Sequence, residues 1–296
     1  MDERRTLYSV EEHIATITIN RPPRNALTHK DIQELGDLVT EADRDDDVRV
    51  IVLTGAGDRA FSSGGDMKVL FEGAFEARES PEAREAMDHE ELDLKGAEYL
   101  FKSAEESHKE MLYMNLMRQT GSGLVHERLR KIQTPSIAAV NGDAVGYGCE
   151  IALCCDMRVA SENARFGEVM VQIGVVPEMG IYLLPMIVGL TKAYEMLLTG
   201  DLVDAAEAHR TGLVTKVVPQ EDLMSATMKL ASRIASNPPA AVRLTKEGMR
   251  QFLDMPLEDL AIFGRTTWQL LDRSDDFREA VRAFREKRKP VFTGKL

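Results

Sequence analysis

The stretch NGDAVGYGCEIAL, residues Asn141–Leu153, passes from the end of an apolar run, through small residues, into a second apolar run that carries one carboxylate. Gly146, Tyr147 and Gly148 stand where we expect a strand to turn into a helix, because glycine is the usual turn residue. The first residues of a helix present backbone N–H groups without intrahelical partners, together with a partial positive charge. The stretch therefore predicts main-chain donors and the Glu150 carboxylate at one place.

A second turn of the same design precedes it in the chain. SSGGD, residues Ser62–Asp66, also ends an apolar strand and begins a helix. Two sets of amide donors aimed at one point would stabilise an oxygen on which negative charge develops. The alternative is that both stretches are simple turns, since glycine is common in turns of every kind.

The whole chain follows this strand–turn–helix organisation until late in the sequence. HIATITIN and VRVIVLTG are typical of strands, and after Glu221 only helical patterns remain. These patterns predict an α/β core over residues 1–220 and a helical domain over 221–296. The region 76–123 is charged, rich in Met and helical where it is patterned, so we expect an extra helical segment there.

Composition limits the classes of function. The 296 residues are 44% apolar and 29% charged, which is typical of a globular protein. The net charge of −12 argues against nucleic-acid or membrane-surface binding, which requires a positive field. No apolar run is long enough to span a bilayer. The three cysteines cluster in an apolar stretch without a matching Cys or His cluster, so we expect buried reduced thiols, a cytoplasmic location and no metal site.

Five motifs together carry a family resemblance. AFSSGGDMK, PSIAAVNGDAVGYGCEIALCCD, ARFGEVMVQIGVVPEMG, AAEAHRTGLVTKVVP and FREKRKPVF occur in the order and spacing of the crotonase (enoyl-CoA hydratase/isomerase) superfamily, which the chain resembles outside the 76–123 segment. The resemblance implies a spiral of ββα units and a C-terminal α-helical trimerisation domain. It also implies an acyl-CoA thioester substrate, with no cofactor beyond the coenzyme A of that substrate.

The resemblance assigns an oxyanion hole to two backbone amides. Gly65 matches the first donor and Tyr147 the second, where the family usually has glycine. A donor at Tyr147 requires a turn geometry that tolerates a Cβ atom. Its ring could lie in or beside the acyl pocket.

The acid/base residues depart from the family pattern. Glu150 matches one of the two glutamates of family hydratases, but Met170 stands where the second is found, and a thioether cannot exchange protons. Glu178 occupies a position at which several relatives, among them dienoyl-CoA isomerases, carry an acid. We therefore expect Glu150 and Glu178 to form the working pair, with pKa values pushed apart by a partly apolar cleft. The alternatives are that Glu178 is a solvated or salt-bridged loop residue and that Glu168 takes its role.

Basic and aromatic residues offer contacts for coenzyme A. Arg24 lies in the RPPRNAL loop, and Lys68 follows the first oxyanion donor by one helical turn. Phe284 and Lys287 match a family aromatic and lysine that reach the adenine from a neighbouring subunit. Arg and Lys are the expected partners of phosphate. The alternative for the basic run near Lys287 is a solvated helix end. No motif partner is evident for the six scattered histidines, which are His13, His29, His89, His108, His126 and His209.

The resulting hypothesis is an enzyme that stabilises a thioester enolate, with hydration or dehydration of an enoyl-CoA as its first reading. Double-bond isomerisation is the second reading, and decarboxylation or C–C hydrolysis of an acyl-CoA is the third. A non-catalytic scaffold that binds CoA esters is the alternative of another class. The resemblance implies a homotrimer or a dimer of trimers. The 76–123 segment is predicted to be a lid or pocket wall, or else an oligomer contact or surface elaboration.

Overall fold

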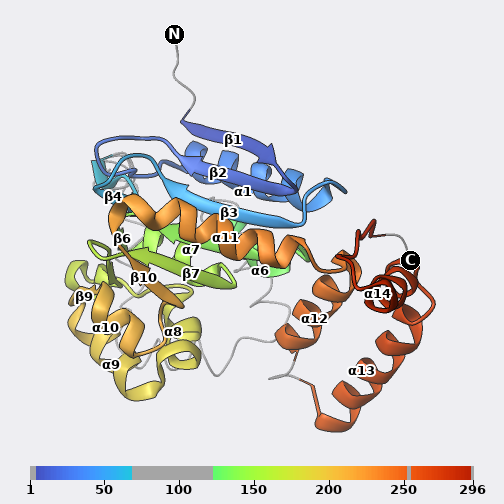
Figure 1. Ribbon diagram of the computed structural model, residues 1–296. Coiled ribbons are helices and arrows are strands. Elements are labelled where there is room, and N and C mark those ends of the chain that lie inside the picture. The colour runs from blue at the N-terminus through green and yellow to red at the C-terminus, as the bar shows by residue number, and fades with distance from the viewer. Residues whose placement is uncertain (1–4, 69–122, 252–254, 295–296) are drawn as a thin grey trace, which may run out of the picture.

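The structure of the chain, a computed structural model, describes residues 5–68, 123–251 and 255–294 (Figure 1). Two sheets and the helices around them make up the described core. The segment predicted over 76–123 lies outside the described residues, apart from Gly123 at the start of a helix.

The larger sheet has six strands in the order β1-β2-β3-β5-β7-β10. The β1–β2 pair is antiparallel and each other neighbouring pair is parallel. Parallel neighbours need long crossover connections, which here carry the second sheet and several helices. The strands span Thr6–Glu11 (β1), Ile14–Ile19 (β2), Val50–Gly55 (β3), Ser136–Val140 (β5), Met157–Ser161 (β7) and Lys216–Val218 (β10).

The smaller sheet has four short strands in the order β4-β6-β8-β9. They span Ala60–Ser62 (β4), Asp143–Val145 (β6), Arg165–Gly167 (β8) and Val203–Asp204 (β9). Each of β3, β5 and β7 is followed by a strand of this sheet, and both sets keep the same neighbour order. The chain therefore advances as a spiral of repeated two-strand units, which confirms the predicted α/β class.

Side-chain alternation along β3 explains why its sequence is a continuous apolar run. Ile51 and Leu53 enter the core cluster between the sheets, whereas Val50 and Val52 enter a second cluster on the opposite face. Successive strand side chains point to opposite faces, so a strand covered on both sides has no polar face. The second cluster is covered by α11, Leu223–Ala235, which packs on β2, β3, β5 and β7.

The first helix, α1, spans His29–Arg44, and Thr28 is its N-cap. The Thr28 hydroxyl accepts from the Asp31 amide, and the Asp31 carboxylate accepts from the Thr28 amide at 2.8 Å. Such a capping box satisfies two end donors and is worth about 1 kcal/mol.

The remaining core helices surround the smaller sheet. They are α6 (Gly123–Lys131), α7 (Tyr147–Cys154), α8 (Gly180–Val188), α9 (Leu190–Thr199) and α10 (Ala205–Arg210), with 3₁₀ turns at Val169–Ile173 (η1) and Gln220–Asp222 (η2). A proline inside a helix removes one backbone hydrogen bond and often ends the helix. Pro185 lies inside α8, and the break falls at Gly189, whose φ of 78° a residue with a side chain adopts only at a cost.

The C-terminal helices stand to one side of the core (Figure 1). They are α12 (Pro239–Gln251), α13 (Leu257–Leu271) and α14 (Asp275–Glu286). Because α11 packs on the sheet, the last helical run of the sequence contributes to the core as well as to this group; the division of the chain at residue 220 stays a prediction. Among the helices that the structure describes, none is both long and apolar enough to cross a membrane.

Candidate active site

The first glycine turn is tied to the loop before α1. The Leu27 amide donates to the Gly64 carbonyl and the Asp66 amide donates to the Leu27 carbonyl, each at 2.8 Å. These two bonds form an isolated parallel bridge between Leu27 and Gly65. In a parallel bridge the central residue bonds through its neighbours, so its own N–H points away from the partner chain. The bridge therefore directs the Gly65 amide away from Leu27.

The second glycine turn begins α7 and packs against the first. Gly146, with φ 54° and ψ −127°, is the N-cap, and Tyr147 is the first helical residue. A Cβ atom on Gly148 would lie 2.1 Å from the Ser62 carbonyl oxygen, and one on Gly64 would lie 3.1 Å from the Tyr147 amide nitrogen. Only glycine permits this approach. The structure thus brings together the two turns that the sequence separates by about eighty residues.

Glu150 lies one turn into α7 and is fully buried. Its Oε1 accepts from the amides of Met179 at 2.7 Å and Gly180 at 3.1 Å, at the start of α8. Burial raises the pKa of Glu150 to about 7; backbone donors, that of Gly180 first, oppose the rise, and the Glu178 carboxylate adds to it. A carboxyl with such a pKa can both take up and release a proton near neutral pH.

Glu178 lies beside Glu150; that the two form the working pair stays a prediction. Its side chain is exposed, in the loop that precedes α8. One of its carboxylate oxygens lies within 4.8 Å of an oxygen of Glu150 and of a ring nitrogen of His126. The Tyr147 hydroxyl is part of the same group of side chains, because its pKa is raised first by burial and then by Glu178 and Glu150.

His126 is a site residue that the sequence analysis missed. It lies on α6, is buried, and its Nε2 atom is 3.7 Å from Oε2 of Glu150. Its ring lies 4.3 Å from the Tyr147 ring, centroid to centroid, at an interplanar angle of 43°. Burial lowers the pKa of His126 to about 3, so the imidazole is neutral. The one signal in the sequence was a histidine on the same helix face as Val125 and Leu129.

Glu168, the fallback acid of the sequence analysis, follows β8 and is also fully buried. Its pKa is raised well above the usual range by burial and then by the charge of Glu150. Its Cδ atom would lie 2.9 Å from a Cβ on Gly180. It is therefore a neutral carboxylic acid packed against the start of α8.

Met170 lies next to the second glycine turn. Its sulfur is 3.6 Å from the place where a Cβ on Gly146 would lie. The position that the resemblance assigns to a second glutamate is thus at the site, occupied by a side chain that cannot transfer protons.

The residues predicted to bind coenzyme A fall into two groups. The Arg24 carbonyl accepts from the Ser63 amide, and the exposed Arg24 guanidinium lies 3.3 Å from Asp143. Lys68 is exposed two residues beyond Asp66, so both cations flank the first glycine turn. Phe284, 85% exposed, and Lys287 lie on or directly after α14, on the far side of the molecule from β4 (Figure 1). A single chain does not bring the two groups together.

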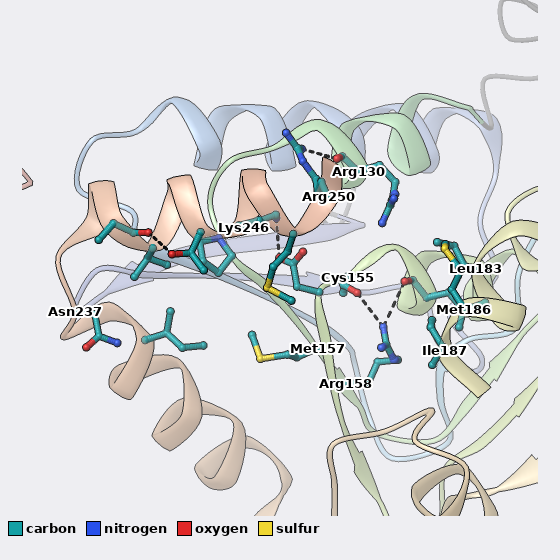
Figure 2. Close-up of a pocket in the computed structure, with 18 of the residues that line it drawn as sticks. Arg130, Cys155, Met157, Arg158, Leu183, Met186, Ile187, Asn237, Lys246 and Arg250 are labelled. Carbon is teal, nitrogen blue, oxygen red and sulfur yellow. Dashed lines mark hydrogen bonds and ion pairs between the residues drawn. The ribbon is translucent and has the colours of Figure 1, made fainter. Parts of the chain in front are cut away.

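The carboxyl end of α7 is anchored by Arg158 on β7. Its Nε donates to the Leu213 carbonyl at 2.6 Å, and its Nη1 donates to the Ala152 carbonyl at 3.1 Å. Nη1 also donates to the Cys155 carbonyl at 2.8 Å (Figure 2). A cation at this end of a helix satisfies its last carbonyls and its dipole. Arg158 also lines a cavity of about 850 Å³ between α8 and α12, whose lining includes none of Gly65, Tyr147 and Glu150.

Fold and site together fit one class: an α/β enzyme with a titratable carboxyl beside paired main-chain amide turns. Comparison with known proteins points to the same class of enzyme. A model of the family described as enoyl-CoA hydratase/isomerase matches residues 9–92 and 102–295. The chain belongs to this family, within the crotonase superfamily, and is an enzyme of the hydratase/isomerase type.

Individual relatives extend over nearly the whole chain. It is 36% identical over 287 residues to (E)-benzylidenesuccinyl-CoA hydratase of Thauera aromatica, covering 96% of this chain and 97% of that protein. It is 32% identical to short-chain-enoyl-CoA hydratase of Clostridium acetobutylicum, with 98% and 97% covered. The crystal structure of an enoyl-CoA hydratase from Bacillus anthracis superposes with a TM-score of 0.80 at 28% identity, covering 99% of this chain and all of that one.

Proposed function

We propose that the chain catalyses the reversible addition of water to the double bond of an enoyl-CoA thioester. The observation that carries this proposal is Glu150: a buried carboxyl with a pKa of about 7, fixed by two backbone amides, one helical turn from the second glycine turn. The relatives whose names describe hydration of enoyl-CoA compounds support the same reaction.

The two glycine turns supply electrostatic stabilisation. The thioester carbonyl oxygen accepts from the amides of Gly65 and Tyr147, which lie on turns in contact with each other. When a water oxygen adds to C3, the electron pair of the double bond is displaced toward the thioester carbonyl oxygen and an enolate forms. Donors already aimed at the developing charge lower the barrier, and a single donor of this type is worth about a hundredfold to a thousandfold in rate.

Glu150 and Glu178 handle the two protons of the reaction. One carboxylate removes a proton from the water that adds to C3, and the other group, as the carboxylic acid, delivers a proton to C2. The product gains one water, and the carboxyls exchange protonation states. Glu178 is exposed, so it can return the pair to its starting state by exchange with solvent. Repulsion between the two carboxylates favours the singly protonated pair that this reaction needs.

Coenzyme A binding completes the proposal. Arg24 and Lys68 contact phosphates near the first glycine turn, while Phe284 and Lys287 reach the adenine from the neighbouring subunit of a homotrimer or a dimer of trimers. Assembly is supported by large exposed apolar side chains, among them Leu190, Tyr194 and Leu198 on α9 and Ile262 and Trp268 on α13. The enzyme needs no cofactor beyond the substrate's coenzyme A. Three buried free cysteines fit a cytoplasmic location.

Double-bond isomerisation is the second candidate, and one observation favours it. Met170 occupies the place of the second hydratase glutamate, next to Gly146. The Glu150–Glu178 pair could instead remove a proton from one carbon of the acyl chain and return one to another.

Turnover in heavy water separates these reactions. The enzyme would be incubated with enoyl- and 3-hydroxyacyl-CoA esters, including crotonyl-CoA and (E)-benzylidenesuccinyl-CoA, and the products weighed by mass spectrometry. Hydration adds the mass of one heavy water, whereas isomerisation changes the mass only by hydrogen–deuterium exchange. Products that show exchange alone across the set would overturn hydration in favour of isomerisation. Tight binding without any mass change would instead indicate a non-catalytic CoA-ester scaffold.

A further inference from the structure

His126 presents an unusual polar contact inside the protein. It lies on the face of α6 that packs against α7, next to the buried Val125. Among the residues that the structure describes, neither ring nitrogen of His126 has a hydrogen-bond partner, and the same holds for Oε2 of Glu150. Buried polar atoms without partners cost free energy. These two unpartnered groups face each other at 3.7 Å.

At 3.7 Å, Nε2 of His126 and Oε2 of Glu150 are one small movement away from a hydrogen bond. This separation exceeds a hydrogen-bond length by less than 1 Å, and it is too short to hold a bridging water in normal geometry. Catalytic hydrogen bonds are often long in unliganded enzymes and shorten when substrate binds. A small rotation of either side chain would bring the Nε2–H group onto Oε2.

The chemistry of a neutral imidazole suits this role. Because burial keeps the pKa of His126 near 3, the ring carries one N–H and no charge at neutral pH. It can donate to the Glu150 carboxylate without forming the full salt bridge that would hold that group permanently ionised. The Tyr147 ring, tilted against the imidazole at 4.3 Å, limits its rotation from the other side.

We propose that His126 is a positioning residue that acts through Glu150, donating from Nε2 to Oε2 while the Met179 and Gly180 amides hold Oε1. Both oxygens of the catalytic carboxylate are then fixed, and its orientation toward the substrate is set from three elements: α6, α7 and the start of α8. This inference rests on the proposed role of Glu150 as the acid/base.

Several other groups also influence the charge of Glu150, from each element that packs on it. They are Tyr147, Cys149 and Cys154 on α7, Glu168 after β8 and Glu178 before α8. The replacement of His126 changes none of these groups chemically, so the test needs a variant that keeps the ring contact with Tyr147.

The test compares two replacements of His126. His126→Phe keeps a flat ring against Tyr147 but removes the donor, and we expect kcat to fall about tenfold to a hundredfold with KM unchanged, as for a misplaced catalytic group. In the pH–rate profile, the limb that reports ionisation of Glu150 should move to higher pH, because the carboxylate loses a hydrogen-bond donor that stabilises it. His126→Gln places an amide N–H near the position of Nε2. We expect this variant to regain the unmodified kcat and the unmodified position of the Glu150 limb in the pH–rate profile.

Two controls separate positioning from folding. Val125→Ala, the adjacent buried residue on α6, should lower the melting temperature and leave the pH limb where it is. In a Glu150→Gln background, His126→Phe should cause no further loss of rate, because the two residues act as one unit. A His126→Phe enzyme with unchanged rate and pH profile, alongside an inactive Glu150→Gln enzyme, would overturn this inference alone. A fully active Glu150→Gln enzyme would overturn the proposed function.

Discussion

Within the described part of the chain, two glutamates are completely buried, and they differ in what surrounds them. Glu150 receives two backbone amides, and its pKa is about 7. Among the described residues, no backbone amide donates to Glu168, and the opposing effect of the Cys149 thiol leaves its pKa well above the usual range. Gly180 contacts both: its amide donates to Glu150, while its Cα faces the carboxyl of Glu168.

The comparison shows how a buried acid keeps both of its protonation states accessible. Burial alone drives a carboxyl to its neutral form, and this has happened at Glu168. At Glu150, main-chain donors offset part of the burial cost, so both protonation states stay accessible near neutral pH. The backbone amides at the start of α8 thus distinguish the proposed acid/base, Glu150, from Glu168, although both side chains are equally inaccessible.

Replacing the first of these acids should have the largest effect. Glu150→Gln keeps the shape of the side chain but removes its proton chemistry, and we expect kcat to fall about a thousandfold, within the range of general acid–base catalysis. Substrate binding, measured by titration calorimetry with a non-reacting acyl-CoA, should change little. A rate within a few-fold of the unmodified enzyme would remove Glu150 from the mechanism.

The pH dependence of stability should carry the signature of Glu150. Its folded-state pKa is raised from 4.5 to about 7, so the folded protein binds more protons than the unfolded chain in that window. The stabilisation is complete below pH 4.5 and is lost as pH rises through 7. At about 1.4 kcal/mol per pKa unit, the loss is about 3 kcal/mol.

Urea unfolding between pH 4 and pH 8 would measure this slope. The unmodified protein and Glu150→Gln should differ in that window, with the variant showing the flatter profile. Identical profiles would mean that Glu150 titrates alike in the folded and unfolded states, contrary to the comparison.

Replacing the exposed partner should have the next effect. Glu178→Gln removes one of the two proton-transferring groups and a negative charge beside Glu150, and we expect kcat to fall about a hundredfold. Because the nearby charge raises the pKa of Glu150, its loss should also move the Glu150 limb of the pH–rate profile to lower pH. A normal rate would indicate that Glu178 is a solvated loop residue.

The smallest effect is expected at the other buried glutamate. Glu168→Gln reproduces the neutral acid that burial already enforces, so turnover should change less than twofold and the free energy of unfolding by less than about 1 kcal/mol. A loss of turnover comparable to that of Glu150→Gln would instead make Glu168 a working acid and end the contrast between the two sites.

The sequence predicted the parts of the site that are local in the chain. The glycine turns, Glu150 and Glu178 stand within recognisable motifs, and contact between the turns requires glycine at Gly64 and Gly148. His126 could not be found in this way, because α6 is separate from those motifs and its role depends on packing against α7. The difference between Glu150 and Glu168 could not be predicted from the sequence either. It depends on backbone amides at the start of α8, and every residue except proline has such an amide.

Arg158 gives the fold a further consequence. Its guanidinium is fastened to carbonyls at the carboxyl end of α7, while glycine contacts with β4 fix the amino end. A helix that is fixed at both ends cannot rotate when negative charge develops on a bound oxygen. The dipoles that meet this charge are therefore oriented during folding, and little of the activation free energy is spent on turning them in each catalytic cycle.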